Sequence, residues 1–366
     1  MFYGYNYILI VPSAKSSEGI NMLSDRIELH WIDSFESIFK SCKLNPSETA
    51  IILSETQSRE LNCNLAELAL SRMGVPFYSI KVTSPRTISE AIIRSSGASL
   101  ALNGQDKAVT ALCDADFVVD LTLEGLMHSA QTHKILKSGT RIMTISNEHP
   151  DILTRLMPTE DLKQNTLEAS RLCRKSKEME VTSSRGTNLS VDMKGNNTVG
   201  VWGFTDKPGT LAHWPGGLVV SFPAAGSVNG TLVLQPGDIN LTFKKYFESE
   251  VKLMIESDYV VSIDGTGSDA KLMSNYLSSF GDKNCYATSH VGWGLNKLSR
   301  YESLTMYDKK DLNGTELRSL AGNFLYSTGA NEFANRFTDG HFDLPMMECT
   351  ISIDGKKVVV DGALVE

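Results

Sequence analysis

The sequence lacks most of the features that mark a secreted, redox-active or membrane protein. Its six cysteines are scattered, and no two of them form the C-x-x-C pair of a zinc or disulfide-exchange site. No segment approaches the roughly 18 uninterrupted apolar residues of a membrane-spanning helix, and the first residues show no basic stretch followed by an apolar run. We therefore expect reduced thiols, no membrane insertion and a cytoplasmic location.

Positive charge is also in short supply. The chain has 35 Lys and Arg residues against 43 Asp and Glu residues, which gives a formal net charge of −8. Proteins that bind nucleic acids need a basic surface that displaces counterions from the phosphates. We expect no nucleic-acid partner, and the 366 residues are enough to bury the cores of two domains.

The first 158 residues alternate short apolar runs with amphipathic segments, which is typical of a layered α/β domain with a mostly parallel sheet. No G-x-G-x-x-G follows the first apolar run, so a dinucleotide site is not expected there. The predicted strands cover 7–11, 50–53, 117–121 and 141–145, and the predicted helices include 64–72 and 89–94.

A polar helix is predicted over 160–177, and the chain after it is richer in Gly, Thr, Asn and Val. We predict that residues 159–366 form a second, β-rich α+β domain. Asp354-Gly355 is a two-residue hairpin signal, and Gly265-Thr266-Gly267 is interpreted as a tight strand-to-helix turn rather than a dinucleotide fingerprint. The predicted strands cover 187–193, 231–234, 240–243, 259–263, 350–353 and 357–360.

The most informative motif is His341-Phe342-Asp343. Side chains two positions apart in an extended segment point to the same side, so one imidazole and one carboxylate converge. A structural hydrogen bond between the two would explain the pair equally well. A third ligand is needed to favour a metal site.

His290 is the candidate for that third ligand, because it stands just before the glycine-bracketed Trp293, where the backbone can turn tightly around a pocket. Two histidines and one carboxylate leave adjacent coordination positions open, as in non-haem Fe(II) oxygenases. Zinc could use the same three residues, with water as the fourth ligand.

The remaining histidines have weaker grounds for a role. We interpret His30, in a predicted strand, and His133, on a predicted helix, as structural, and His149 as a turn residue. His213 precedes Trp214-Pro215-Gly216-Gly217, whose glycines could line a cleft. His128 follows the carboxyl end of the predicted strand 117–121, where open α/β sheets bind ligands.

Several segments of the C-terminal half, and more faintly the N-terminal part, resemble a known group of proteins. This group comprises the aminopeptidase T-type metallopeptidases and their relatives, the 2,5-dihydroxypyridine 5,6-dioxygenases. The segments that carry the resemblance are Gly186-Thr187-Asn188-Leu189, Phe222-Pro223-Ala224-Ala225-Gly226, the residues around His290, and 331–343.

Departures from the peptidase pattern favour the dioxygenase branch. The family pattern implies that the peptidases hold two metals partly through glutamates, whereas here Ser227 or a neighbour stands at the first glutamate position and His290 at the second. Leu317 is close to the place of a further peptidase histidine. A two-metal site is hard to assemble without these ligands, which favours a single metal ion. A metallopeptidase remains the alternative, because the two branches share a fold.

The resemblance implies Fe(II) held by His290, His341 and Asp343, a homo-oligomer, and the opening of 2,5-dihydroxypyridine by O₂ to N-formylmaleamate. His128 matches the place where the dioxygenases keep an acid/base histidine. We further expect Arg318 to face the polarised substrate oxygen as a fixed cation; a structural ion pair is the other interpretation of this residue.

Overall fold

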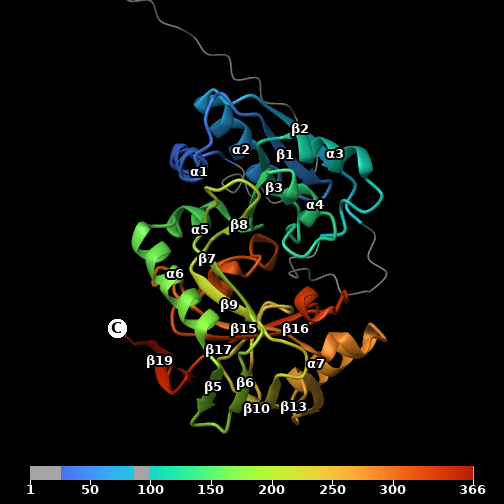
Figure 1. Cartoon of the computed structure of the whole chain (residues 1–366), viewed down its shortest axis with the longest axis vertical. Coiled ribbons are helices and arrows are strands. Elements are labelled where there is room, and N and C mark those ends of the chain that lie inside the picture. The colour runs from blue at the N-terminus through green and yellow to red at the C-terminus, as the bar shows by residue number, and fades with distance from the viewer. Residues whose placement is uncertain (1–25, 86–98, 366) are drawn as a thin grey trace, which may run out of the picture.

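The computed structural model describes residues 26–85 and 99–365, and its N-terminal part is built around a five-stranded sheet (Figure 1). The strand order is β2-β1-β3-β4-β8, and every neighbouring pair is parallel. The predicted strand 7–11 and helix 89–94 lie outside the described residues. The strands are β1 (Ala50–Glu55), β2 (Phe77–Val82), β3 (Phe117–Leu121), β4 (Arg141–Ile145) and β8 (Leu211–Trp214).

Helices cover both faces of this parallel sheet, as predicted. Alternate residues of one strand enter different cores: Ile52 packs with the apolar residues of α1 and α2, whereas Ile51 packs with those of α3 and α4. A sheet buried on both faces has the nearly continuous apolar strands that the sequence shows. The helices are α1 (Leu29–Ser41), α2 (Glu60–Met73), α3 (Asp106–Asp114), α4 (Thr132–Lys137) and α5 (Pro150–Arg155).

The rest of the chain is dominated by two sheets that pack face to face around a large apolar core. The outer sheet has the order β14-β13-β10-β6-β5-β18-β19-β20, and the inner sheet has the order β17-β16-β15-β9-β7. The outer strands are β5 (Glu178–Ser183), β6 (Asn188–Asp192), β10 (Val228–Leu234), β13 (Val251–Glu256), β14 (Tyr259–Asp264), β18 (Cys349–Ile353), β19 (Lys356–Val360) and β20 (Ala363–Leu364). The inner strands are β7 (Asn197–Val201), β9 (Leu218–Phe222), β15 (Thr288–Gly294), β16 (Phe324–Thr328) and β17 (Phe342–Met346).

Burial follows this arrangement strand by strand. The outer strands β6 and β13 alternate buried and exposed residues, whereas every residue of β9 and β15 in the inner sheet is buried. The inner sheet is therefore covered on both faces. One face packs on the core, and the other faces the N-terminal part (Figure 1).

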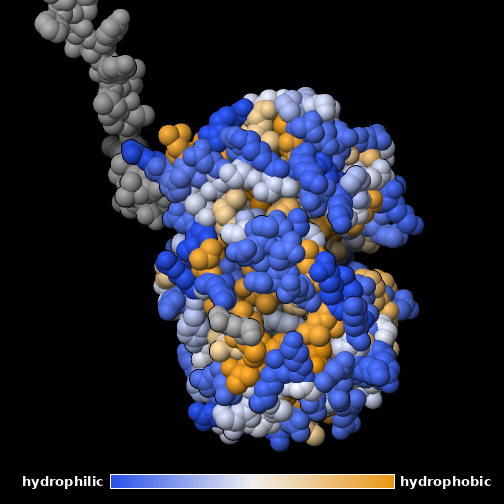
Figure 2. Space-filling model, turned by 60° about the vertical axis from the view of Figure 1, so that its left-hand side comes forward, coloured by the Kyte–Doolittle hydropathy of each residue, from blue (hydrophilic) through white to orange (hydrophobic). Residues whose placement is uncertain are grey.

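Two longer helices complete this second part: α6 (Glu160–Lys175), which packs on β7 and β9, and α7 (Ser268–Ser279). Thr159 caps α6 by accepting the amide N–H of Leu162. None of the helices in the described ranges is long and apolar enough to cross a membrane. Hydrophilic residues cover most of the face shown in Figure 2.

Most predicted strands of this part are confirmed: 187–193, 231–234, 259–263, 350–353 and 357–360 correspond to β6, β10, β14, β18 and β19. Asp354 and Gly355 both have positive φ, as the predicted hairpin turn requires. The 265–267 segment is a strand-to-helix turn between β14 and α7. A Cβ on Gly267 would lie 2.1 Å from Ser249 Oγ, which explains the glycine without any bound nucleotide.

Two predicted strand positions are wrong. His30 lies in α1, because Trp31, Phe35, Ile38 and Phe39 recur at helical spacing and bury one face of that helix. The strand predicted at 240–243 is reduced to β11 (Ile239–Asn240), which pairs with β12 (Lys245–Tyr246). Asn240 ends it, because its side-chain oxygen accepts the amide N–H of Phe243 and favours a turn.

Strand β8 links the two parts of the molecule. It follows β7 of the inner sheet in the chain, yet it pairs with β4 at the edge of the parallel sheet. The N-terminal sheet therefore includes residues beyond 158. The division into domains at residues 158 and 159, between α5 and α6, stays a prediction.

Candidate functional site

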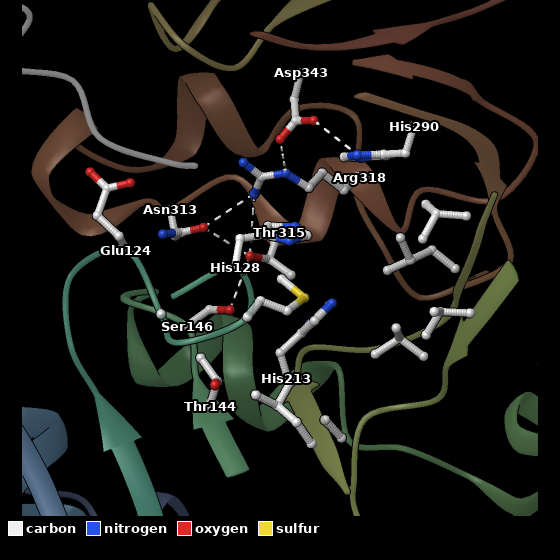
Figure 3. Close-up of a pocket in the computed structure, with 18 of the residues that line it drawn as sticks. Glu124, His128, Thr144, Ser146, His213, His290, Asn313, Thr315, Arg318 and Asp343 are labelled. Carbon is white, nitrogen blue, oxygen red and sulfur yellow. Dashed lines mark hydrogen bonds and ion pairs between the residues drawn. The ribbon is translucent and has the colours of Figure 1, made fainter. Parts of the chain in front are cut away.

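A cavity of about 170 Å³ lies between the parallel sheet and the inner sheet (Figure 3). Three strands of the parallel sheet reach it near their carboxyl ends: His128 comes from the loop after β3, Ser146 follows β4, and His213 lies in β8. Ligands bind at this edge in open α/β sheets, because the loops there converge and differ freely in sequence. The cavity is thus placed where the fold favours a ligand.

The floor of the cavity is one face of the inner sheet, where β15, β16 and β17 bring three polar residues into a row. His290 is opposite Ser327, and Ser327 is opposite Asp343. Residues directly opposite each other in a sheet have Cβ atoms roughly 5 Å apart. The row explains why residues distant in sequence meet here, and His341 joins it from the segment just before β17.

The same face of the inner sheet becomes apolar toward its other edge. A small cluster of buried residues on β7, β9 and β16 lines this end of the cavity. It consists of Val201, Leu218, Val220, Phe222 and Leu325. The cavity thus has a polar end at β17 and an apolar end at β7 and β9. A ring bound against the apolar end would displace water from it.

Asp343 is the centre of the polar end. Its Oδ1 lies 3.1 Å from His341 Nε2 and 3.6 Å from His290 Nε2, and its Oδ2 accepts a hydrogen bond of 2.5 Å from Arg318 Nε. Burial acts to raise the pKa of Asp343, but Arg318 and His341 outweigh it and hold that pKa well below the ordinary value. Asp343 is therefore a carboxylate at any working pH.

His290 is held as a neutral imidazole. Burial lowers its pKa to about 3, although the Asp343 carboxylate acts in the opposite direction. Its Nδ1 lies 3.1 Å from Ser289 Oγ, and its Nε2 lies 2.9 Å from Ser327 Oγ. Neutral imidazole is the form of histidine that binds metals.

His290, His341 and Asp343 carry donor types that bind transition-metal ions, and two distances from Asp343 Oδ1 can be compared with the spacing of ligands on one ion. Two donors bonded to one ion at about 2.1 Å and at right angles lie about 3.0 Å apart, close to the 3.1 Å and 3.6 Å measured from Asp343 Oδ1. Within residues 26–85 and 99–365, no three His, Cys, Asp or Glu side chains already converge on one point. In this structure Ser327 and Arg318 donate hydrogen bonds to the Asp343 carboxylate, and the ligand set of His290, His341 and Asp343 stays a prediction.

His128, predicted as an acid/base residue, lines the cavity from the N-terminal side. Its Nδ1 lies 3.6 Å from Glu332 Oε2, and its ring packs edge-on against Phe222, with the ring centres 5.8 Å apart. Phe222 also packs against His290. His128 thus shares an aromatic neighbour with His290, one of the predicted metal ligands.

Arg318, at the end of the short helix α9 (Thr315–Arg318), also lines the cavity. It contacts Asp343 and donates to Asn313 Oδ1 at 3.2 Å. His213, which the sequence marked only by its glycine-rich neighbours, lies at the opposite side of the cavity (Figure 3). His133 lies exposed on α4, and His149 caps α5 by accepting the amide N–H of Asp151.

Burial of His213 predicts how the stability of the chain depends on pH. Burial lowers the pKa of His213 from 6.5 to about 4, so the unfolded chain takes up a proton below pH 6.5 that the folded chain excludes. The free energy of unfolding is therefore expected to fall as the pH drops from 6.5 toward 4, by at most about 1.4 kcal/mol per pH unit from this residue. His290 contributes in the same direction.

His213→Asn should flatten this part of the pH dependence. Urea unfolding of the metal-free protein between about pH 4 and pH 7 measures the effect, with the exposed His133→Asn as the matched control. An unchanged slope in His213→Asn would show that its imidazole is not kept neutral by burial.

The positions that would carry the second metal of a peptidase are not assembled here. Ser227 lies in the turn between β9 and β10 and is not among the residues that line the cavity. Leu317 is fully buried in an apolar cluster with Ile239, Leu241 and Leu320. Neither position offers a metal donor to the site.

Some residues of the site could not be found from the sequence. Ser327 carries no motif, and only the pairing of three strands places it between His290 and Asp343. Asn313 and Thr315 belong to the turn before α9, and their contacts to Arg318 depend on tertiary structure. Glu148 does not line the cavity, but it follows the buried strand β4, and a carboxylate after such a strand is a sequence signal for a functional residue.

A family model and a known protein sequence both match almost the whole chain, and both have the same description. The sequence model of the family described as 2,5-dihydroxypyridine 5,6-dioxygenase matches residues 30–366. A protein of that name from Pseudomonas putida strain KT2440 is 33% identical over 336 residues, which cover 90% of this chain and 95% of that protein.

Two solved structures illustrate the similarity of the fold to known proteins. The structure of 2,5-dihydroxypyridine dioxygenase from Pseudomonas putida KT2440 superposes with a TM-score of 0.85 at 32% identity, covering 92% of this chain and 96% of that one. Wild-type AmpT from Thermus thermophilus superposes with a TM-score of 0.62 at 11% identity, covering 92% and 99% of the two chains. The second likeness concerns the fold alone.

Proposed function

The chain belongs to the family of 2,5-dihydroxypyridine 5,6-dioxygenases, and we propose that it opens the ring of 2,5-dihydroxypyridine with O₂ to give N-formylmaleamate. The observation that carries this proposal is the row on the inner sheet, where His290 and His341 flank the Asp343 carboxylate at the floor of the cavity. The resemblance also implies a homo-oligomer, which analytical ultracentrifugation would measure.

We propose Fe(II) as the metal, with His290, His341 and Asp343 as its protein ligands. Two imidazoles and one carboxylate form the ligand set of non-haem iron oxygenases. When bound, Fe(II) would supply adjacent open positions and a route for electrons between the ring and O₂. The neutral His290 and the ionised Asp343 are already in the protonation states that such ligands need.

His128 is suited to accept the proton that a ring hydroxyl gives up. Its Nδ1 faces the Glu332 carboxylate, which leaves Nε2 as the nitrogen for the substrate proton. Imidazole is an effective base near neutral pH. Arg318 is suited to stabilise negative charge on a substrate oxygen, because its guanidinium is held in place by Asp343 and Asn313.

The apolar end of the cavity would keep water from the reacting ring. Val201, Val220 and Leu325 offer no hydrogen-bonding side-chain groups, so the hydroxyl groups of a bound ring are directed to the polar end. Water exclusion also strengthens the electrostatic interactions of Arg318 and Asp343 in the site.

Isotope labelling gives a direct prediction for this reaction. The product contains all ring atoms plus two oxygen atoms, so both atoms of one O₂ molecule are expected in each product molecule, with one O₂ consumed per ring. The enzyme is loaded with Fe(II) under anaerobic conditions and supplied with ¹⁸O₂ and 2,5-dihydroxypyridine. Mass spectrometry of the product then gives the number of ¹⁸O atoms that it contains.

Oxygen derived from water, or only one labelled atom, would identify a hydrolase or a monooxygenase instead. Oxygen uptake over a panel of hydroxypyridines, with an aminoacyl-p-nitroanilide as the matched control substrate, separates the proposal from a metallopeptidase. Release of nitroaniline without O₂ uptake would favour the peptidase.

A further inference from the structure

Glu148 is a buried carboxylate that no part of the proposed mechanism uses. It follows β4 and is fully buried, yet its oxygens accept three consecutive amide N–H groups from the other part of the molecule. Oε2 accepts from Asn313 at 2.8 Å, and Oε1 accepts from Gly314 at 2.9 Å and from Thr315 at 2.8 Å. One side chain thus fixes the whole turn over residues 313–315.

This turn contacts Arg318 directly. Arg318 Nη1 donates to Asn313 Oδ1 at 3.2 Å and lies 3.4 Å from Thr315 Oγ1. At its other end, Arg318 Nε donates to Asp343 Oδ2 (Figure 3). Contacts therefore run without a break from Glu148 through the turn to Arg318 and on to the predicted metal ligand Asp343.

The turn has little freedom of its own. Gly314 has a φ of +94°, and a Cβ at this position would lie 2.9 Å from Leu241 Cδ2. Thr315 Oγ1 also donates to Ser146 Oγ, at 3.0 Å, in the same connection that carries Glu148. The turn is thus fastened to the end of β4 by backbone and side-chain bonds alike.

We propose that Glu148 is a positioning residue for the ring-opening reaction, which acts through the 313–315 turn to aim Arg318 at Asp343 and at the bound ring. The inference rests on the proposed function of the site. An arginine side chain has several rotatable bonds, and its guanidinium is useful in catalysis only where neighbouring groups hold it in one orientation. Glu148 provides that support from the opposite part of the molecule.

Glu148→Gln tests the proposal, because the amide NH₂ cannot accept the bonds that one carboxylate oxygen now accepts. A displacement of about 1 Å at a catalytic group costs roughly 100-fold in rate. We expect kcat for 2,5-dihydroxypyridine to fall about 10- to 100-fold in the Fe(II)-loaded enzyme. In an Arg318→Ala background, the same substitution is expected to change kcat less than about twofold, since the group it positions is gone.

Asp269→Asn is the matched control. Asp269 is also buried and accepts the amide N–H groups of Glu248 and Ser249, but it does not line the cavity. It should lower the thermal midpoint Tm without lowering kcat. Equal fold losses from Glu148→Gln with and without Arg318, or a similar loss of kcat in Asp269→Asn, would overturn the proposal.

A crystal structure of Glu148→Gln gives a readout that does not depend on activity. The guanidinium of Arg318 is expected to leave Asp343 Oδ2, and an unmoved guanidinium would overturn the proposal even if the substrate of the enzyme proved to be different. An unaltered kcat in Arg318→Ala would instead count against the role given to Arg318 in the proposed function. If Glu148→Gln does not fold, Glu148→Asp, which keeps the charge but shortens the side chain, takes its place in the same measurements.

Discussion

Replacing His341 by Ala is expected to remove both the bound iron and the ring-opening activity while the fold persists. His341 supplies one of two imidazoles in the proposed ligand set, and its Nε2 lies 3.1 Å from Asp343 Oδ1. Loss of a group that only supports a ligand typically costs about 10- to 100-fold in metal affinity, so loss of a ligand should cost more. His341 lines the cavity and is not part of the apolar core, so Tm should change little.

Iron content after Fe(II) loading and gel filtration, measured together with oxygen uptake, tests this expectation. The exposed His133→Ala on α4 is the matched control and should keep both. Full iron occupancy in His341→Ala would remove His341 from the ligand set. The same measurement on His290→Ala and Asp343→Ala would then show which residues hold the ion.

Replacing His128 by Ala should slow turnover by about 10²- to 10⁴-fold, the usual effect of losing a general base. The metal should remain bound, because His128 lies on the N-terminal side of the cavity, across Phe222 from His290. Single-turnover rates and iron content are the measurements. Substrate affinity should change far less than the rate.

The exposed His30→Ala serves as the control for His128. Turnover close to that of the unaltered enzyme would make His128 a structural residue of the cavity wall. Loss of iron would mean that His128 belongs with the ligands instead. A faster rate in His128→Ala upon addition of imidazole would support its role as a base.

The sequence predicted those parts of the fold that local patterns encode. Apolar runs predicted β1, β3 and β4 of the parallel sheet, and alternation predicted most of the outer sheet, because burial on two faces or one leaves a period in the sequence. Strands β2 and β8 and the five strands of the inner sheet are not among the predicted strands. The errors at His30 and at 240–243 have local causes. A helical period was missed in the first case, and the side chain of Asn240 forms a turn in the second.

The site was predictable only as far as the chain carries short-range signals. The spacing of His341 and Asp343 predicts that they point the same way, and the structure places them 3.1 Å apart. His290, Ser327 and Asp343 lie side by side because of the register of three strands, which no local pattern specifies. The contacts of Glu148 with residues 313–315 are likewise long-range.

The dioxygenase branch is distinguished from the peptidase branch by metal ligands of the peptidases that this sequence lacks. Ser227 and Leu317 stand where the resemblance implies peptidase ligands, and neither brings a donor to the cavity. The family match agrees with the dioxygenase branch predicted from these departures. A fold shared with AmpT could not have decided between them, because fold does not fix function.

The return of the chain to the parallel sheet through β8 affects how the protein must fold as it is synthesised. Ile142 of β4 has Leu211 of β8 as its partner, and α6 with three strands of the sandwich lies between them in the chain. When only the N-terminal part of the chain has emerged from the ribosome, the edge of β4 has no partner strand. The ring of Trp214 is then also missing from the apolar core of the parallel sheet. The two parts must therefore mature together, and His213 reaches the cavity only when that late strand docks.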